Sequence, residues 1–464
     1  MYTGEEERRV LRKMDRGVVL FIAGLYLLSF LDRSNIGNAR IAGLQTDLRM
    51  TGPQYEWLLT AFYISYIAFE WMALMFRLVP PHIYISICVL AWGIIASLQA
   101  LTTSFVQMLI LRAVLGVAEA AFCGVPFYLS FFFRRAELAG RVGVFISASP
   151  LATSFASAIA WLITWTAQGV GIAPWRALFL VEGFPSVLVA VYVWRALPDG
   201  PDSAAFLTPR ERRVAVMRLR GQKEESHGHS VKLQEILATI RDPKSWMTAF
   251  MFFSCNVAFS SLPVFLPTII HEMGFSPLAS QAMSAPPYMV AFFTVLLTAH
   301  ASDRARARSP FIILHAGLAC AGYTTMFLCA WLGLPNALRY LAVYPAASGF
   351  FSCVTLILTW TLNNQASDAG RGAGVALLQY IGQCGPLLGT RLYPSTDGPL
   401  YLRGTAVCAG FMALAGCLAW GLRTLLRREN ARIRAEMVVG DQGEEGVELL
   451  EGREASEERF MFML

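Results

Sequence analysis

The sequence predicts an all-α membrane protein with twelve transmembrane helices in two pseudo-symmetric six-helix bundles. Of its 464 residues, 55% are hydrophobic and only 15% are charged, whereas a typical soluble domain carries about 25% charged residues. The apolar residues fall into twelve blocks of roughly 20 residues, the length of a helix that crosses about 30 Å of hydrocarbon. These observations exclude a soluble enzyme, a secreted disulfide scaffold and a nucleic-acid-binding protein.

The twelve blocks give approximate helix positions along the chain. We expect helices at 17–41, 55–78, 82–102, 104–128, 141–166, 176–196, 244–270, 282–300, 310–332, 336–361, 372–392 and 401–425. An even number of crossings puts both termini on one side of the membrane. Most of the 38 Lys and Arg residues fall in the tails and loops of that side. The exceptions are Arg33, Arg40, Arg49, Arg112, Arg176, Arg339, Arg391 and Arg403. Because basic residues favour the cytoplasmic side, we expect both termini in the cytoplasm.

The longest polar stretch lies between the sixth and seventh helices and divides the chain into two halves. The expected units are an N-terminal tail and bundle (1–196), a cytoplasmic loop (197–243), a C-terminal bundle (244–426) and an acidic cytoplasmic tail (427–464). In the loop, Thr208-Pro209-Arg210-Glu211 predicts a capping box that starts a short helix to about Arg220. Lys232–Arg241 predicts a second, amphipathic helix at the membrane surface. We expect residues 435–464 to be disordered.

The first helix carries charges where charges are costly. Val18–Leu31 is too short to span the membrane alone, so the helix must continue through Asp32, Arg33 and Asn35. About 15 residues of rise place this segment near the middle of the bilayer. Two interpretations stay open: a buried carboxylate beside a buried guanidinium lining a cavity, or an early helix end with these residues in an outer loop. Asp32 and Asn35 share one face, and Arg33 points about 100° away.

The fourth helix carries a second pair of opposite charges. Arg112 and Glu119 are seven residues apart, which places them on one face about 10 Å from each other. Gly116 lies between them and allows another helix or a ligand to approach closely. Arg112 lies at a depth comparable to Arg33, so two acids and two guanidiniums converge at one level. The alternative is a purely structural ion-pair network.

Other polar residues inside the apolar blocks are weaker candidates. Tyr63, Tyr66 and Glu70 share one face of the second helix at i, i+3 and i+7, with Glu70 as a gate or hinge residue. We expect Glu182 to pair near the outer surface, close to Arg176. The second half has no acid in its helix interiors. Its polar in-membrane residues are Asn256, Tyr288, Tyr344, Gln379, Gln383, Asn363 and Asn364.

Helix-breaking residues in the eleventh block predict a local bend. Gly382, Gly385, Pro386 and Gly389 allow close contacts but interrupt the backbone hydrogen bonds. The nine cysteines all lie inside apolar blocks, and the six histidines show no metal-ligand spacing. No nucleophile motif and no phosphate-binding loop occurs. The sequence therefore predicts no enzyme activity, no metal and no cofactor.

Two six-helix halves joined by a long cytoplasmic loop resemble the major facilitator superfamily, whose substrate site lies near the midplane between the halves. Five motifs resemble more narrowly the anion:cation symporter family, in particular its fungal branch of allantoate, nicotinate and pantothenate permeases. They are Asp32-Arg33-Ser34-Asn35-Ile36-Gly37-Asn38-Ala39, Phe62-Tyr63-Ile64-Ser65-Tyr66-Ile67-Ala68-Phe69-Glu70, Arg112-x-x-Leu115-Gly116-x-x-Glu119-Ala120, Trp175-Arg176-x-Leu178-Phe179-Leu180-x-Glu182-Gly183-x-Pro185-Ser186 and Asp397-Gly398-Pro399-x-Tyr401.

This resemblance implies proton-coupled transport of a small organic anion. In related symporters the two acid–arginine pairs serve proton and anion binding, which implies proton coupling by Asp32 and Glu119 and substrate binding by Arg33 and Arg112. We expect Asn35, Tyr63, Asn256, Gln379 and Gln383 to complete the substrate site. Asp303 and Arg304 match the family's basic gate, with Glu70 as a further gating residue. The chain departs from the family after Glu70, where Trp71-Met72-Ala73 replaces Pro-Ser-Asn.

The function that the sequence predicts is therefore secondary active transport, with a carboxylate and a proton as partners. We expect a functional monomer in the plasma membrane, with the lipid bilayer as its surroundings and no nucleic-acid partner. An exporter of a fungal secondary metabolite is the alternative with the same fold. A non-transporting nutrient sensor is a third possibility, which would normally need a large signalling domain.

Overall fold

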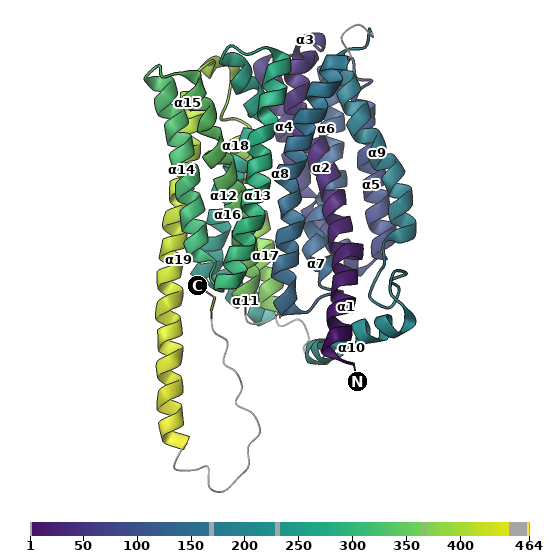
Figure 1. The fold of residues 1–464 in the computed structure, drawn as a ribbon, viewed down its shortest axis with the longest axis vertical. Coiled ribbons are helices and arrows are strands. Elements are labelled where there is room, and N and C mark those ends of the chain that lie inside the picture. The colour runs from purple at the N-terminus through teal and green to yellow at the C-terminus, as the bar shows by residue number, and fades with distance from the viewer. Residues whose placement is uncertain (1, 167–170, 228–232, 366–367, 445–461, 464) are drawn as a thin grey trace.

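The computed structural model describes all residues except 1, 167–170, 228–232, 366–367, 445–461 and 464. Long helices run side by side along the vertical axis of Figure 1, and no β-strand occurs among the described residues. Helix α1 and the last described residues lie at the same end of the bundle (Figure 1). We call this the terminal end, and the opposite end the far end.

The N-terminal half contains all six predicted helices, several of them interrupted. Its elements are α1 (Gly4–Met14), η1 (Asp15–Val19), α2 (Leu20–Ala39), η2 (Arg40–Leu44), α3 (Gln45–Asp47), α4 (Gly52–Ala68), η3 (Glu70–Arg77), α5 (Pro81–Gln99), α6 (Phe105–Ala120), η4 (Ala121–Gly124), α7 (Val125–Leu129), α8 (Arg135–Thr166) and α9 (Pro174–Ala196). Helix α2 continues through Asp32 to Ala39. This result excludes the early helix end that the sequence left open.

The polar loop and the C-terminal half follow the predicted order. The loop forms α10 (Pro209–His227) and α11 (Leu233–Arg241). The second half contains α12 (Pro243–Glu272), α13 (Pro277–Ala305), α14 (Ser309–Trp331), α15 (Asn336–Leu341), α16 (Val343–Asn363), α17 (Asp368–Gly382), α18 (Gly385–Gly389), η5 (Ser395–Asp397) and α19 (Leu402–Glu444). The predicted capping box is present, because the Thr208 amide donates to Glu211 and the Glu211 amide donates to Thr208 Oγ1.

Every predicted transmembrane block coincides with helix, which confirms the all-helical membrane class. In the part of the chain that the structure describes, ten helices are long and apolar enough to cross a membrane, and the bent pair Gly52–Ala68 and Glu70–Phe76 makes eleven if it counts as one span. The eleventh predicted block, 372–392, holds α17 and α18, of 15 and 5 residues, which are too short to span separately. The predicted bend between them is present, but the count of twelve spans is not confirmed.

The two halves touch each other at the far end through close backbone and polar contacts. A Cβ at Gly37 on α2 would lie 2.2 Å from the Val264 carbonyl oxygen on α12, so only glycine allows this approach. Thr60 and Thr390 lie 3.2 Å apart across the same interface. Ser154 on α8 donates to the Ala285 carbonyl on α13 at 3.0 Å. These contacts hold α2, α4 and α8 against the C-terminal half.

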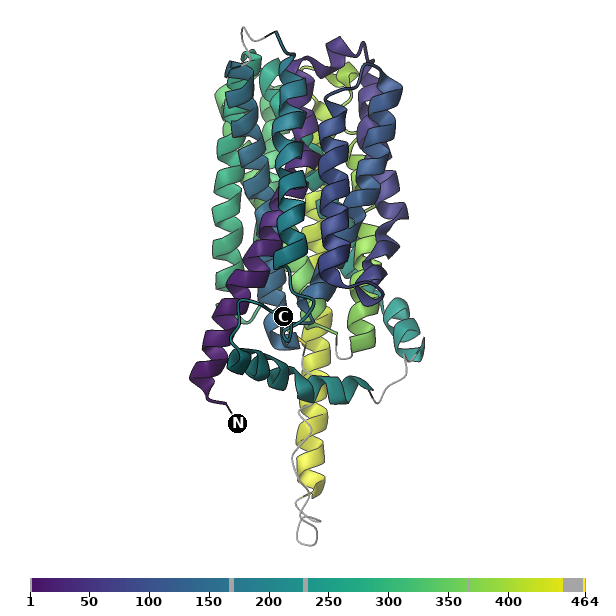
Figure 2. The same cartoon turned by 90° about the vertical axis from the view of Figure 1, so that its right-hand side faces the viewer.

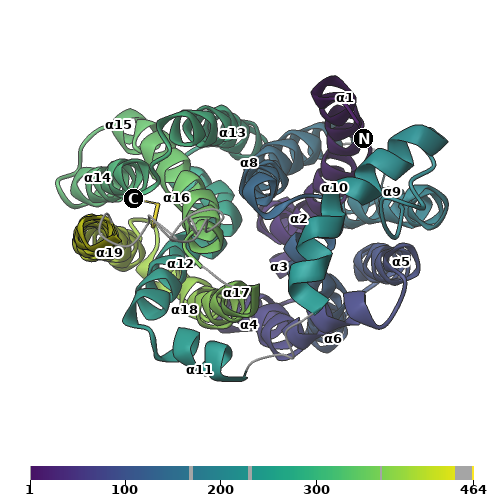
Figure 3. The ribbon, with the colours of Figure 1, turned by 90° about the horizontal axis from the view of Figure 1, so that it is seen from below.

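The polar loop forms part of an ion-paired layer at the terminal end, where α10 lies across the bundle (Figure 3). Arg218 on α10 is buried and bonds Glu7 at 2.8 Å and Glu137 at 2.5 Å. Burial alone would lower the pKa of Arg218, but its bonds to Glu137 and Glu7 raise that pKa above its ordinary value. Lys13 bonds Glu211 at 2.8 Å and lowers the pKa of that carboxyl. The loop is therefore fastened to α1 and α8.

Helix α19 continues well beyond its predicted end, and Figure 2 shows it projecting from the bundle at the terminal end. It remains helical to Glu444, where we expected disorder from 435, and residues 445–461 lie outside the described residues. The chain returns at Phe462 and Met463. Asn364 donates to the Met463 carbonyl at 3.0 Å and accepts from its amide at 2.7 Å. The C-terminal residues are thus hydrogen-bonded to the end of α16.

Candidate functional site

The centre of the N-terminal half holds a buried ion pair between α2 and α6. Arg33 Nη2 lies 2.9 Å from Glu119 Oε2, and Arg33 Nε donates to the same oxygen at 3.2 Å. Ser29 Oγ adds a third bond to that oxygen at 3.0 Å. Glu119 Oε1 is buried and has no hydrogen-bond partner among the described residues. The carboxylate is therefore held by one oxygen and left incompletely satisfied by the other.

Aromatic rings surround the guanidinium of this pair. Arg33 Cζ lies 4.8 Å from the ring centroid of Tyr66, 5.1 Å from Phe62 and 5.7 Å from Phe30. Phe30 in turn contacts Phe259 of α12 edge to face, with centroids 5.2 Å apart. These contacts stabilise the cation by its position over ring faces. Phe30 therefore lies between the ion pair and Phe259 of the C-terminal half.

The second pair predicted from the sequence has a looser arrangement. Arg112 Nη1 donates to the backbone oxygen of Asp32 at 3.4 Å, and its guanidinium lies 5.5 Å from the Phe179 ring centroid on α9. Arg112 Nε and Nη2 have no partner among the described residues, nor has Asp32 Oδ2. Adjacent residues on a helix point about 100° apart, so the Asp32 side chain leaves α2 in a different direction from Arg33, which faces Glu119. The structure thus brings together all four charged residues singled out from the sequence.

The structure adds Glu182 to this group, contrary to the expectation that it pairs near the surface. Arg176 bonds Asp47 at 3.3 Å instead. Glu182 is 3% exposed, both its carboxyl oxygens lack partners among the described residues, and Arg112 lies 5.5 Å from the ring of Phe179, one turn earlier on α9. The spacing of Phe179 and Glu182, three residues apart on α9, places both on one face. The sequence shows that spacing, but it does not show that this face of α9 lies against Arg112 of α6.

The remaining predicted polar residues divide between the two halves. Asn35 and Tyr63 are buried in the N-terminal half, and both amide atoms of Asn35 lack partners among the described residues. Asn256 on α12 donates to the Gly382 carbonyl at 3.1 Å, at the point where α17 ends. Gln379 Oε1 is buried without a partner in the described part of the chain. Gln383 lies in the break between α17 and α18.

In the described structure, the predicted gating residues make no hydrogen bond or ion pair with the charged group. Glu70 is buried, but it begins η3 after α4 ends, so it does not continue the helical face of Tyr63 and Tyr66. Asp303 lies near the end of α13 and forms an ion pair with Arg308, whereas Arg304 is solvent-exposed. A Cβ at Gly140 on α8 would lie 3.5 Å from Asp303 Oδ2. Asp303 therefore lies beside the opposite half at the terminal end.

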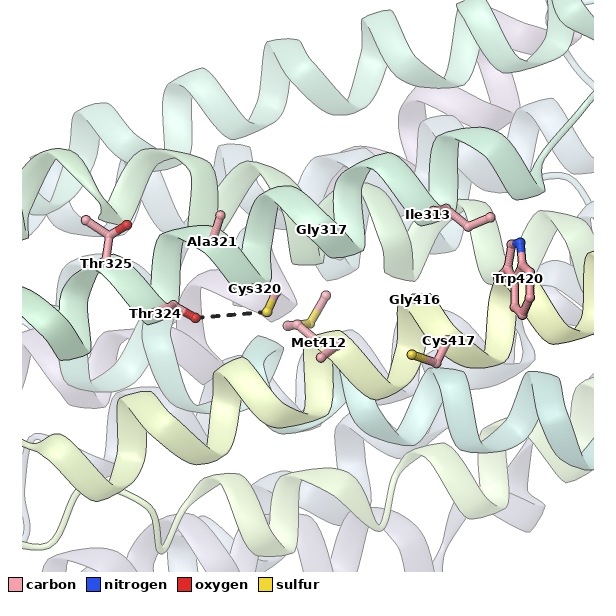
Figure 4. Close-up of a pocket in the computed structure, with 11 residues that line it drawn as sticks. Ile313, Gly317, Cys320, Ala321, Thr324, Thr325, Met412, Gly416, Cys417 and Trp420 are labelled. Carbon is pink, nitrogen blue, oxygen red and sulfur yellow. Dashed lines mark hydrogen bonds between the residues drawn. The ribbon is translucent and has the colours of Figure 1, made fainter.

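A groove of 640 Å³ lies elsewhere, on the outer surface between α14 and α19 (Figure 4). Its walls are apolar or small side chains such as Ile313, Gly317, Gly416 and Met412. Trp420 at its edge is 64% exposed, which shows that the groove opens outward from the bundle. None of the predicted site residues lines this groove. It is therefore separate from the charged group.

Comparisons with known proteins agree with this architecture. The sequence profile of the Major Facilitator Superfamily matches residues 22–390. The chain is 31% identical over 435 residues to the MFS transporter prlL of Fungal sp. (strain NRRL 50135), covering 90% of this chain and 86% of the relative. It is 27% identical to the high-affinity nicotinic acid transporter of Saccharomyces cerevisiae, covering 92% of this chain and 80% of the relative.

Solved structures show the same fold at low sequence identity. The partially occluded inward-open form of the xylose transporter XylE from E. coli aligns with a TM-score of 0.64 at 14% identity, over 87% of this chain and 98% of XylE. A bacterial homologue of the human lysosomal transporter Spinster gives the same TM-score at 16% identity, over 88% of this chain and 96% of that one. The relatives and neighbours named are transporters. The predicted fold class and the prediction of a transporter rather than an enzyme are confirmed.

Proposed function

The chain belongs to the Major Facilitator Superfamily, and we propose that this transporter couples the movement of a small organic carboxylate to that of a proton. The observation that carries the proposal is the Arg33–Glu119 ion pair, which is buried yet leaves one carboxylate oxygen unsatisfied. A buried guanidinium held by an incompletely satisfied carboxylate is suited to exchanging that partner for another carboxylate. The experiments below test this exchange.

The exchange gives a physical basis for coupling. Arg33 donates two hydrogen bonds to one oxygen of Glu119, so a substrate carboxylate and ionised Glu119 compete for the same donors. Two carboxylates facing one guanidinium leave an unbalanced buried charge, which is costly in a low-dielectric interior. A proton on Glu119 removes that charge and releases Arg33 to the substrate. Substrate and proton therefore enter the site together.

Arg112 offers a second point of attachment. Its Nε and Nη2 have no partner among the described residues, and Asp32 beside it has a free carboxyl oxygen. We infer that Arg112 and Asp32 repeat the arginine–acid arrangement at the same level. Asp32 then serves as a proton site together with Glu119, while Asn35 and Tyr63 contribute neutral hydrogen-bonding groups on the same side.

We propose that neutral side chains of the C-terminal half select the shape of the substrate. Asn256, Gln379 and Gln383 supply uncharged amides near the break between α17 and α18, opposite the charged half. The aromatic contact between Phe30 and Phe259 joins the two halves at the ion pair. A small planar carboxylate fits this combination of guanidinium and ring faces. The relative named as a nicotinic acid transporter makes nicotinate the first candidate to test.

We also propose the position of a gate and the orientation of the protein in the membrane. Asp303, paired with Arg308 and lying beside α8, is suited to a contact that opens when the halves separate at the terminal end. Arg304 and Glu70 lie at this end as further gating candidates. The basic loops favour cytoplasmic termini, and we propose a monomer in the plasma membrane. The relatives include transporters from fungi, which agrees with the permease branch that the motifs resemble.

The test is uptake by proteoliposomes that contain the purified protein and an imposed inward proton gradient. The substrates are labelled nicotinate, allantoate, pantothenate, ureidosuccinate and sugar acids. We expect proton-dependent accumulation of one of them, and loss of accumulation but not of exchange in Asp32→Asn. Uphill transport that persists in Asp32→Asn would overturn the assignment of this proton site. If folded protein takes up none of these substrates but transports a compound outward, the result would favour the metabolite exporter.

A further inference from the structure

The buried charged group holds more acids than bases. It consists of the guanidiniums of Arg33 and Arg112 and the carboxyls of Asp32, Glu119 and Glu182, all at most 8% exposed. If every group were ionised, the group would carry one unbalanced negative charge. An unbalanced charge in the interior of a membrane protein is costly and is normally removed by protonation or pairing.

The unbalanced charge belongs to the side of Arg112, because the other side already forms a close pair. Arg33 and Glu119 lie 2.9 Å apart, which accounts for one base and one acid. Arg112 is the remaining guanidinium, and it lies against both helices that carry the remaining acids. Its Nη1 donates to the Asp32 backbone oxygen at 3.4 Å, and its Cζ lies 5.5 Å from the Phe179 ring, one turn before Glu182 on α9. Neither remaining carboxyl has its full complement of hydrogen bonds in the described structure. Two carboxyls that share one compensating charge hold a proton between them, as in carboxyl dyads.

We propose that Glu182 is a third coupling residue, which keeps one proton resident on the Asp32–Glu182 pair and acts on transport through Asp32. This inference rests on the proposed proton symport and deepens it. The negative charge that Glu182 contributes makes it easier for Asp32 to remain a proton acceptor beside Arg112. Without Glu182, ionised Asp32 pairs with Arg112 alone and gives up that proton.

Among the described residues, the other charged side chains on the elements packed against α9 are paired elsewhere. Helix α9 packs against α2, α5, α8 and η2. On α5, His82 bonds Asp199, and on α8, Arg141 bonds Asp15, both toward the terminal end. Arg40 on η2 donates to Gln45 and lies over the ring of Tyr55. Asp32 on α2 and Arg112, which lies over Phe179 one turn from Glu182, remain as the charged groups on this side.

The first experiment compares the pH dependence of driven uptake in wild type, Glu182→Gln and Glu182→Asp. We expect Glu182→Gln to lower the pH of half-maximal uptake by about 1 unit, because a neighbouring negative charge that favours proton binding is removed. Glu182→Asp keeps the charge and is expected to retain most of the wild-type profile. Exchange at saturating substrate is expected to change less than twofold in either variant.

Ser186→Ala is the matched control. Ser186 lies four residues beyond Glu182 on the same face of α9, is fully buried and has no partner for its hydroxyl among the described residues. Its replacement alters packing on this face without altering the number of carboxyls, so the wild-type pH profile is expected. A Glu182→Gln profile that coincides with wild type would overturn the inference. So would a parallel loss of exchange, driven uptake and thermal stability, because that pattern marks a structural residue.

A second measurement does not depend on transport. Infrared spectra of the purified protein near neutral pH report the carbonyl stretch of protonated carboxyl groups. We expect the difference spectrum of wild type minus Glu182→Gln to show the loss of one such group, with no loss in Ser186→Ala. An unchanged band in Glu182→Gln would exclude the resident proton. If wild type shows this proton but no proton-driven uptake of any substrate, the proposed symport fails while the resident proton stands.

Discussion

The two halves of the molecule have similar helical frames but different interiors. The N-terminal half buries two guanidiniums and three carboxyls around α2, α6 and α9, several of them with unpaired atoms. The C-terminal half buries neutral groups, such as Asn256, Tyr288 and the Oε1 atom of Gln379. The ionised side chains of that half that the structure describes lie toward helix ends, as Asp303 and Arg339 do. This difference agrees with the proposal that the N-terminal half binds the proton and the substrate carboxylate, while the C-terminal half selects the shape of the substrate.

The energetic consequences of the two interiors differ in size. A buried ion pair is costly to break, because removal of one member leaves an uncompensated charge. Loss of a neutral hydrogen bond leaves only an unsatisfied dipole. Substitutions in the N-terminal half should therefore act strongly on both stability and coupling, and those in the C-terminal half more weakly. The following predictions test that contrast, from the largest effect to the smallest.

The largest effect is expected for Glu119→Ala. It leaves Arg33 buried beside Phe62 and Tyr66 without its carboxylate, which costs about 3–5 kcal/mol of stability. Thermal unfolding in detergent, with Glu119→Gln as the comparison, measures the loss. Because glutamine keeps an acceptor oxygen for Arg33, it should destabilise less while still abolishing proton-driven uptake. Equal stability of Glu119→Ala and wild type would show that the ion pair is not formed in the folded protein.

Gly37→Ala tests the contact that joins the two halves. A Cβ there would lie 2.2 Å from the Val264 carbonyl, so the far-end contact must separate at a cost of about 1–3 kcal/mol. We expect lower thermal stability and slower exchange. Gly24→Ala on the same helix is the control, because a Cβ there meets nothing within 4 Å. If both variants behave alike, the close approach of α2 and α12 does not matter for transport.

Asn256→Ala tests the neutral interior directly against Glu119→Ala. The change removes the hydrogen bond to the Gly382 carbonyl at the end of α17, with an expected cost of about 1–2 kcal/mol. We expect a higher KM for substrate, with the pH dependence of uptake unchanged. A shifted pH profile would contradict the division of labour between the halves.

The smallest effect is expected at the terminal end of the C-terminal half. Asn364→Ala removes two hydrogen bonds to the backbone of Met463, worth about 1 kcal/mol or less each at this partly exposed position. The measurement is the thermal stability of full-length protein, with transport expected within twofold of wild type. A loss of stability as large as that of Glu119→Ala would show that the C-terminal residues matter more than their few bonds indicate.

Much of the fold and part of the site follow from local pattern. Apolar block length located the helices, and the charge of Asp32 and Arg33 within a short block required α2 to continue. Seven-residue spacing put Arg112 and Glu119 on one face. The sequence could not pair these residues across helices. It also misplaced Glu182, because spacing along α9 does not show that Arg176 turns to Asp47 instead. The choice of Arg308 over Arg304 as the partner of Asp303 also depended on the geometry at the end of α13.

The amino-acid sequence by itself determined the membrane class, the order of helices and the level of the buried charges, because burial of apolar length and spacing along a helix are local properties. The tertiary structure decided which buried arginine contacts which acidic residue. Arg33 turns to Glu119, and Arg112 turns to the Asp32 backbone oxygen and the Phe179 ring, because of how α2, α6 and α9 are rotated against each other. That rotation is set by packing across all the helices, including the close glycine contacts between them, and no single helix contains the information.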